Sequence, residues 1–211
     1  MNVLHVFDMD GTILPGTSAS IELARHTGAL PAIDELEQLS AAGQLSNTEF
    51  HRRSHPLWQN LTDDIIDEVF HNSPWIDNLQ PVWADIIARG ETLVVISMSP
   101  LFFVQRLTAW GPSAVFASHN PIGSPFEDSG VLEDYHKVHI VDDLTRTHNI
   151  EPHHVIAYGD SYTDIPLFRT NITSIAINAT PLVESLATHR YRGNDLTAAY
   201  TLARTHLQHQ Q

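Results

Sequence analysis

Five short apolar runs alternate with helical patterns along most of the chain, and this alternation constrains the fold more than any other feature. The runs cover residues 3–7, 92–97, 114–117, 154–158 and 173–177. They are almost continuously apolar and rich in β-branched residues, which is typical of a parallel sheet covered on both faces. Helical patterns occupy residues 100–110, 136–148, 163–169, 181–188 and 195–208. We therefore expect an α/β fold with a doubly wound, Rossmann-like parallel sheet.

The segment between the first two apolar runs breaks this alternation. It contains no convincing strand pattern, and it favours helices at 18–27, 31–42, 47–59, 62–71 and 75–89. Gly28, Gly43 and Gly90 follow three of these patterns, as expected at helix C-termini. We expect a discontinuous core domain formed by residues 1–14 and 81–211, with a helical cap domain inserted at residues 15–80.

Composition excludes several classes of protein and of site. No stretch approaches the roughly 18 consecutive apolar residues of a membrane span, and no signal-peptide pattern is present. The absence of cysteine excludes disulfides and thiolate chemistry and fits a cytoplasmic protein. A net charge of −14 argues against nucleic acid or an anionic membrane as partner. We expect a cytoplasmic protein with a small-molecule partner, and the sequence leaves its oligomeric state open.

Two carboxylates follow the first apolar run, in Asp8-Met9-Asp10-Gly11-Thr12. Alternate residues of an extended segment point the same way, so both carboxylates can face the ligand-binding end of the sheet. Two carboxylates this close cannot both stay ionised without a cation or a proton, and oxygen ligands of this kind suit Mg²⁺. Gly11 would allow the backbone to approach a ligand closely. The alternative is that the pair only caps a loop.

Polar groups also follow the second and fourth apolar runs. Ser97 ends the second run, where its hydroxyl can bind an anion or cap the next helix. Asp160 and Asp164 follow the fourth run and form a second acidic pair, which can also serve as a helix cap. Lys137 is the only lysine of the chain and lies early in a predicted helix, a position that is unfavourable unless it reaches an anionic group.

Taken together, these motifs resemble those of the haloacid dehalogenase (HAD) superfamily of phosphotransferases. "FDMDGT", Ser97, Lys137 and "GDSYTD" match its four motifs in order, and the resemblance covers essentially the whole chain. The phrases "VISMSP" and "AYGDSYTDIPLF" look most like the phosphoserine-phosphatase-like branch, which carries a helical cap between the first two motifs. The resemblance implies a sheet with strand order 5-4-1-2-3 and a cap where the helical interval lies.

The resemblance also implies roles for the acidic residues. Asp8 would be the nucleophile that forms an aspartyl-phosphate, and Asp10 would protonate the leaving oxygen and then deprotonate the attacking water. The Mg²⁺ cofactor would be held by Asp8, the backbone carbonyl of Asp10 and Asp160.

The remaining motif residues are expected to support these groups. Asp164 would support the water shell of the metal or orient Lys137. Ser97 and Lys137, together with Gly11 and Thr12, would hold the phosphoryl oxygens, because phosphoryl transfer depends on positioning and electrostatic stabilisation.

The predicted function is a Mg²⁺-dependent phosphomonoesterase acting on a small phosphorylated metabolite. Haloalkanoate dehalogenases of the superfamily lack the second aspartate, and phosphonate-cleaving members use a cap lysine that this chain does not have. A phosphoryl transferase or mutase is one alternative. A receiver-type phosphoacceptor signalling domain is another, although such domains carry the acceptor on a middle strand and have no cap.

The cap sequence bears on the substrate. In phosphoserine phosphatases a cap glutamate shortly after the first motif is expected to bind the substrate amino group, and Thr17 occupies that place here. Arg52 and Arg53 lie near the expected carboxylate-binding arginine, without a clear register. We therefore expect a substrate other than phosphoserine, with Thr17, Ser18, Arg52 and Arg53 as candidate contacts.

Overall fold

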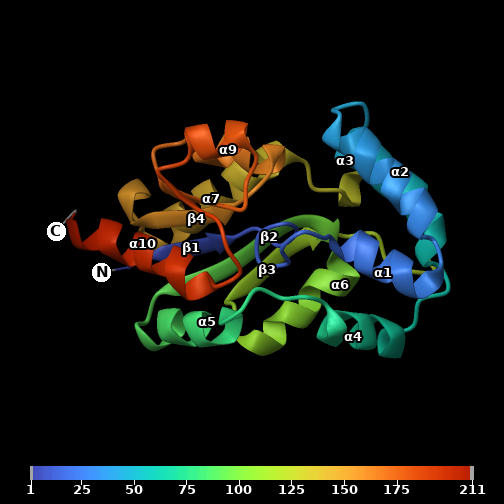
Figure 1. Ribbon diagram of the computed structural model, residues 1–211, viewed down its shortest axis with the longest axis horizontal. Helices are drawn as coiled ribbons and strands as arrows, with labels where there is room; N and C mark the ends of the chain where they lie inside the picture. The colour runs from blue at the N-terminus through green and yellow to red at the C-terminus, as the bar shows by residue number, and fades with distance from the viewer. Residues whose placement is uncertain (1, 210–211) are drawn as a thin grey trace.

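One wholly parallel sheet organises the chain in the computed structural model, which describes residues 2–209 (Figure 1). Its strands have the order β3-β2-β1-β4-β5-β6. The predicted α/β class and the order 5-4-1-2-3 are therefore confirmed, with a sixth strand added beyond β5. The strands are β1 (Leu4–Phe7), β2 (Thr92–Pro100), β3 (Ala114–Ser118), β4 (Val155–Gly159), β5 (Thr173–Ile177) and β6 (His189–Tyr191).

Helices cover both faces of this sheet, as expected for a doubly wound fold (Figure 1). Successive residues of β1 alternate between the two sides: Phe7 packs in one apolar cluster with α5 and α10, and Val6 packs in a second cluster with α7 and α9. The helices that form the two covers are α5 (Leu79–Ala88), α6 (Leu101–Val104), α7 (Asp134–His148), α8 (Ile165–Phe168), α9 (Pro181–Leu186) and α10 (Leu196–His209).

The interval between β1 and β2 is helical, as the sequence predicts. It contains α1 (Ala19–Thr27), α2 (Leu30–Ala41), α3 (Asn47–Ser54), the 3₁₀ turn η1 (His55–Trp58) and α4 (Asp63–Asn72), followed by α5. Ser18 caps α1 by accepting a hydrogen bond from the backbone N–H of Ile21, and Gly28 ends the helix in the left-handed conformation. In Figure 1, α1, α2 and α3 lie beyond the end of the sheet toward which β1 runs.

Four local elements differ from the sequence prediction. The predicted helix 163–169 is divided into the 3₁₀ segment η5 (Tyr162–Asp164) and α8. The strand β6 was not predicted, because its three residues lie at the sheet edge, are partly buried or exposed, and form no apolar run. The predicted helix 100–110 is split into α6 and the 3₁₀ segment η2 (Gln105–Trp110). The predicted helix 47–59 changes to 3₁₀ geometry from His55 onward, beside Pro56, which has no N–H to donate within the helix.

The helices α2 and α3 contact the sheet domain in different ways. Helix α2 has a side-chain contact there between the hydroxyls of Ser40 and Tyr162, 3.1 Å apart. Helix α3 and the turn after it form several hydrogen bonds to β2 and to the segment 118–133. These bonds, which we call the α3 docking contact, join Asn47 to Leu132 O, Thr48 to Glu133, His51 to Met98 O and His55 to Ser124 O.

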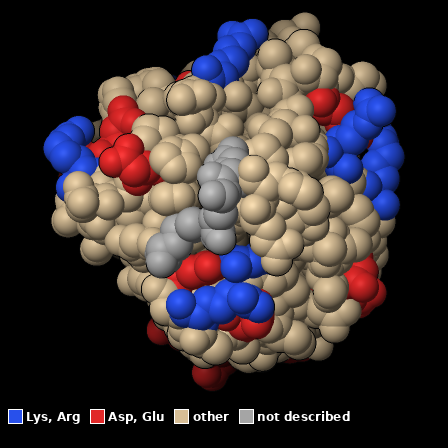
Figure 2. All heavy atoms as spheres, turned by 90° about the vertical axis from the view of Figure 1, so that its left-hand side faces the viewer, with Lys and Arg blue, Asp and Glu red and all other residues tan. Residues whose placement is uncertain are grey.

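The surface is mixed in charge on the face that carries the two chain ends. Figure 2 shows the visible Lys and Arg side chains lying beside Asp and Glu side chains, in separate small groups. Among residues 2–209, no helix is both long and apolar enough to cross a membrane.

Candidate active site

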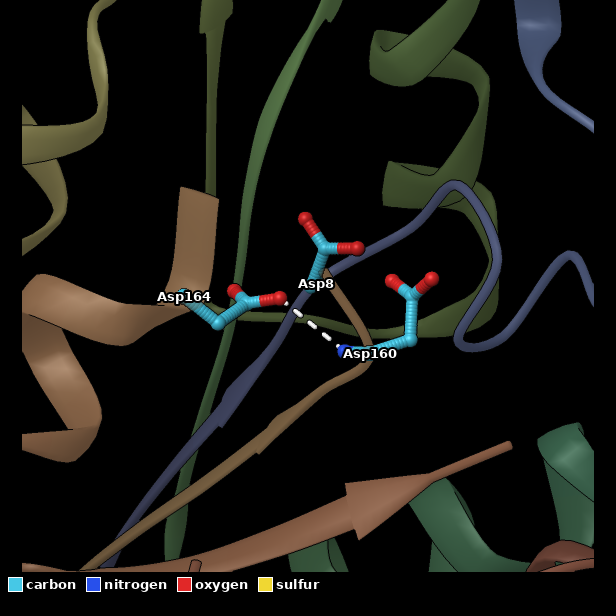
Figure 3. Close-up of side chains that lie close together, drawn as sticks. All are labelled: Asp8, Asp160 and Asp164. Carbon is cyan, nitrogen blue, oxygen red and sulfur yellow. Dashed lines mark hydrogen bonds between the residues drawn. The ribbon is translucent and has the colours of Figure 1, made fainter. Parts of the chain in front are cut away.

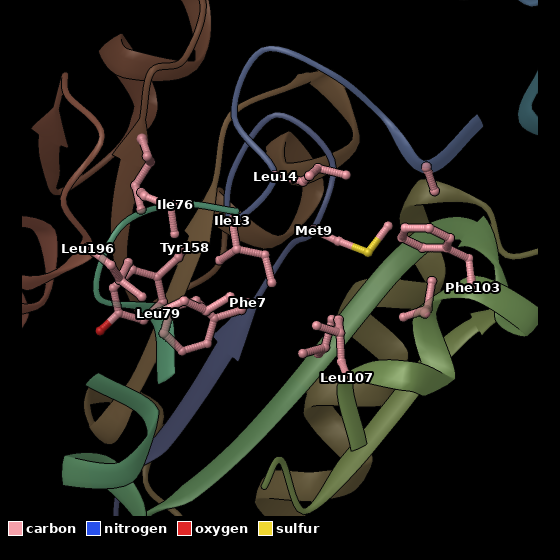
Figure 4. Packing of buried hydrophobic residues seen from close by; sticks show 14 of the residues in the cluster. Phe7, Met9, Ile13, Leu14, Ile76, Leu79, Phe103, Leu107, Tyr158 and Leu196 are labelled. Carbon is pink, nitrogen blue, oxygen red and sulfur yellow. The ribbon is translucent and has the colours of Figure 1, made fainter. Parts of the chain in front are cut away.

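The two aspartates after β1 face a cavity because the residue between them is buried in the core. Met9 has no exposed surface, and its side chain points toward Phe103 (Figure 4). Asp8 continues the strand, since its N–H donates to the carbonyl of Tyr158 at 2.9 Å. Asp8 and Asp10 both line the same cavity, as the alternation of an extended segment predicts.

Lys137 lies between two buried carboxylates. Its Nζ donates to Asp8 Oδ1 at 2.7 Å and to Asp164 Oδ1 at 2.5 Å. Burial alone would lower the pKa of Lys137, but the charges of Asp164 and Asp8 outweigh it and raise that pKa. The unfavourable position early in α7 is thus explained, because the ammonium reaches two anionic groups.

Burial raises the pKa of Asp8 to about 7, although the charge of Lys137 acts in the opposite direction. The charges of Asp164 and Asp10 raise the pKa of Asp8 further. An acid in this environment is stabilised in its ionised form by added positive charge, and a divalent cation would supply it.

Asp8, Asp160 and Asp164 form a compact acidic group, with one oxygen from each lying within 4.8 Å of the others (Figure 3). Asp164 Oδ2 accepts the backbone N–H groups of Asp160 and Ser161 at 3.0 and 3.2 Å, while its Oδ1 accepts from Lys137. Both oxygens of Asp164 are therefore engaged, and Asp8 and Asp160 have more capacity for a ligand.

The oxygen donors fit a hard divalent cation such as Mg²⁺. The space beside Asp160 is shaped by Gly11, whose backbone has φ +75°. A Cβ added there would lie 2.2 Å from Asp160 Oδ2. The residue must therefore be glycine for two reasons, its left-handed conformation and the close approach of the carboxylate. Thr12 Oγ1 donates to Asp160 Oδ1 at 3.1 Å, so this hydroxyl positions Asp160 in the structure.

Asp10 has partners of its own, apart from Lys137. Its Oδ1 accepts the backbone N–H of Ala19 at 2.8 Å, and its Oδ2 accepts the hydroxyl of Ser99 at 2.6 Å. Burial raises the pKa of Asp10, and these hydrogen bonds partly oppose that rise. A carboxyl group with a raised pKa can carry a proton that it later gives away.

Ser97 was predicted as a site residue, whereas Ser99 was not. Ser97 is fully buried, and its hydroxyl accepts the backbone N–H of Ser99 at 3.1 Å. A signal for Ser99 was available, because it stands two residues after Ser97 in the same extended segment and therefore points the same way.

The cavity at this end of the sheet has a volume of 1020 Å³. Asp8, Asp10 and Asp160 line one part of it, and α1 to α3 contribute most of another, including the predicted residue Ser18 and the unpredicted residue Glu37. Further residues of the lining are Gly11, Thr17, Ser40, Asn47, Phe50, Trp75, Met98 and Tyr162.

Arg52 and Arg53, predicted as candidate substrate contacts, lie outside the lining of this cavity. Both are about half exposed and pair with Glu49, and Arg52 also forms two hydrogen bonds of 2.8 Å with Asp128. Neither arginine lines the cavity. Helical periodicity places them on the side of α3 that Glu49 shares, at spacings of three and four residues.

Comparison with known proteins defines the class. Residues 5–169 match the family model of the haloacid dehalogenase-like hydrolases, and the chain belongs to this family. It is therefore a hydrolase, as the motifs predict, and the receiver-type alternative is set aside.

Within that family, the chain is similar to proteins described as phosphoserine phosphatases. It is 21% identical to the phosphoserine phosphatase of Idiomarina loihiensis over 92% of this chain and 90% of that protein. It is 22% identical to a probable phosphoserine phosphatase of Schizosaccharomyces pombe, over 87% of this chain and 64% of that protein.

Solved structures confirm the fold. A phosphoserine phosphatase carrying a phospho-aspartyl intermediate analogue superposes with a TM-score of 0.80 at 19% identity, covering 95% of this chain and 98% of that chain. A HAD family hydrolase from Salmonella enterica serovar Typhi gives a TM-score of 0.81 at 24% identity, covering 93% of this chain and 70% of that chain.

Proposed function

We propose that the protein is a Mg²⁺-dependent phosphomonoesterase that hydrolyses a small-molecule phosphate ester through an aspartyl-phosphate on Asp8. The observation that carries this proposal is the pairing of Asp8 with the buried Lys137, beside Asp160 and at the base of a cavity that also contains Asp10. The family and the phosphatase relatives support the same class of reaction.

The proposed reaction has two displacement steps. A carboxylate oxygen of Asp8 attacks phosphorus, the ester P–O bond breaks, and the leaving alkoxide takes a proton from Asp10. Asp10 then takes a proton from a water molecule, whose oxygen attacks the aspartyl-phosphate. The bond between phosphorus and the Asp8 oxygen breaks and inorganic phosphate leaves. Asp8 is then again a carboxylate, and Asp10 again carries its proton.

Three features of the site fit these roles. Lys137 places positive charge beside Asp8, where it would neutralise charge on the attacking carboxylate and the phosphoryl group. Asp10 is held by Ala19 and Ser99 and does not bind Lys137, so it can exchange a proton while Asp8 stays ionised. Asp164 positions Lys137 through their hydrogen bond of 2.5 Å.

Asp8 and Asp160 would hold the Mg²⁺ ion through their side chains, with the backbone carbonyl of Asp10 as a third ligand. When bound, the ion supplies positive charge that stabilises the transferring phosphoryl group. We also propose that the helices in the segment 15–80 act as the cap of the site, and that Ser97 contributes to binding the phosphoryl oxygens.

Phosphate release from p-nitrophenyl phosphate tests this function. We expect turnover with Mg²⁺, complete loss with EDTA, and loss of turnover in Asp8→Asn with an unchanged circular dichroism spectrum. Asp142→Asn on the exposed side of α7 is a control for the removal of an aspartate and should retain wild-type turnover. Turnover that persists in EDTA would refute the metal requirement, and an active Asp8→Asn variant would refute the nucleophile.

A further inference from the structure

A carboxylate without a basic partner stands among the α2 residues that line the cavity. Glu37 lies on α2, and Ser40 and Ala41 on the same face of this helix line the cavity with it. The hydroxyl of Ser18 donates to Glu37 Oε1 at 2.6 Å. Among residues 2–209, no Lys, Arg or His forms an ion pair with Glu37, and the charges of the acids Asp10 and Asp34 raise its pKa.

Two other glutamates of the segment 15–80 have basic partners. Glu22 is paired with Arg25, and Glu49 is paired with both Arg52 and Arg53. These helices therefore carry arginine side chains, but the arginines do not line the cavity. The described residues that line the cavity include no Lys, Arg or His.

Two consecutive residues connect Glu37 to the catalytic centre by hydrogen bonds. Ser18 binds the carboxylate of Glu37, and the next residue, Ala19, donates its N–H to Asp10. Burial raises the pKa of Glu37, the hydrogen bond from Ser18 opposes that rise, and the charge of Asp10 adds to it. Placing an acid in a partly buried position beside another acid costs free energy, which a cationic ligand would offset.

We propose, building on the phosphatase function proposed above, that the substrate is the phosphate monoester of an amino alcohol that carries no carboxylate. The phosphate group lies at Asp8, and the ammonium group binds Glu37. A carboxylate on the substrate would instead enter a cavity that contains acidic side chains and, among the described residues of its lining, no cation.

The proposed substrate class differs from phosphoserine, the substrate that appears in the names of the relatives. Phosphoserine has the ammonium group that Glu37 can bind, and it also has a carboxylate for which the cavity offers no basic partner. Ethanolamine phosphate has the same phosphate and ammonium groups and lacks the carboxylate. It is therefore the simplest probe of the proposed class.

A matched series of esters tests the proposal. Ethanolamine phosphate and 2-hydroxyethyl phosphate differ only by an ammonium group in place of a hydroxyl, and phosphoserine adds a carboxylate to the first. We expect kcat/KM for ethanolamine phosphate to exceed that for 2-hydroxyethyl phosphate by about tenfold or more, as for a hydrogen bond to a charged group. Phosphoserine is expected to be the poorer substrate of the two amines.

Two variants of α2 assign this preference to Glu37. Glu37→Gln keeps the shape of the side chain and removes its charge. The ratio of kcat/KM for ethanolamine phosphate to kcat/KM for 2-hydroxyethyl phosphate should therefore fall close to one. Glu35→Gln removes a charge from an exposed position of the same helix and should keep the wild-type ratio. Melting temperatures confirm that each variant is folded.

Failure of the substrate proposal can be distinguished from failure of the proposed phosphatase function. Absence of p-nitrophenyl phosphate turnover by the wild-type protein refutes the phosphatase itself. Turnover of the aryl ester without a preference for the ammonium ester overturns the substrate class, as does a preference for phosphoserine. An unchanged ratio in folded Glu37→Gln overturns the role of Glu37. The wild-type comparison decides the substrate class even if that variant fails to fold.

Discussion

His51, one of two histidines in the α3 docking contact, gives the protein a predictable sensitivity to acid. His51 is buried, and its Nε2 lies 2.8 Å from the carbonyl of Met98, one residue after Ser97. Burial lowers the pKa of His51 to about 4, and the hydrogen bond to Met98 and the charge of Glu133 only partly oppose that effect. The neutral imidazole, with its proton on Nε2, is the form that fits this contact.

The sign and size of the pH effect follow from this pKa. The pKa of His51 lies near 6.5 when the chain is unfolded and near 4 when it is folded, so the unfolded chain binds the proton first as the pH falls. The contribution to stability is therefore complete above about pH 6.5 and is lost as the pH falls toward 4. Between pH 7 and pH 5, the free energy of unfolding should fall by about 2 kcal/mol on account of this residue.

Urea unfolding at pH 7 and pH 5 measures this effect in three proteins. His51→Gln keeps a donor for Met98 and does not titrate, so its stability should fall by about 2 kcal/mol less than that of the wild type over this interval. His26→Gln changes an exposed histidine of α1 and should keep the wild-type dependence. Equal losses of stability in wild type and His51→Gln would refute the reasoning, because other buried groups such as His5 are common to both.

Further variants test the site and its surroundings. Gly11→Ala and Gly28→Ala both place alanine at φ +75°, so each should lose about 1 kcal/mol of stability, but only Gly11→Ala displaces Asp160 and should lose Mg²⁺-dependent phosphate release. Lys137→Met leaves buried carboxylates without their cation; we expect a loss of about 3–5 kcal/mol in urea unfolding and at least a hundredfold fall in kcat, and a stable, active variant would contradict this. Arg52→Ala removes exposed ion pairs and an exposed cation–π contact with Phe126, so a change above about 2 kcal/mol in stability, or any fall in kcat/KM, would argue against its placement outside the cavity.

The sheet was largely predictable because its buried strands appear in the sequence as continuous apolar runs. Leu4–Phe7 and Val155–Gly159 are buried along their whole length, and such runs identify central parallel strands. His189–Tyr191 was not predictable by the same reasoning, because an edge strand of three residues, none of them fully buried, is too short to show a periodicity. Its formation depends on pairing with β5, which is a tertiary effect.

The grouping of the candidate site was also predictable, because strand ends in a parallel sheet converge. Asp8, Lys137 and Asp164 come from three separate parts of the chain, and motif order together with topology placed them at one edge. Glu37 was not predicted, since a glutamate in an amphipathic helix is usually a solvated residue. Its importance depends on how α2 is oriented over the cavity, and the sequence of α2 alone does not specify that orientation.

The unequal attachment of α2 and α3 has a consequence for how such a protein can diversify. Residues of α3 are committed to the hydrogen bonds that hold it to β2 and to the segment 118–133, so substitutions there disturb the assembly of the molecule. Helix α2 lines the cavity and has a side-chain contact with the sheet domain between Ser40 and Tyr162. A gene that encodes this protein can therefore acquire a new substrate through changes in α2 while the reaction chemistry and the fold stay as they are.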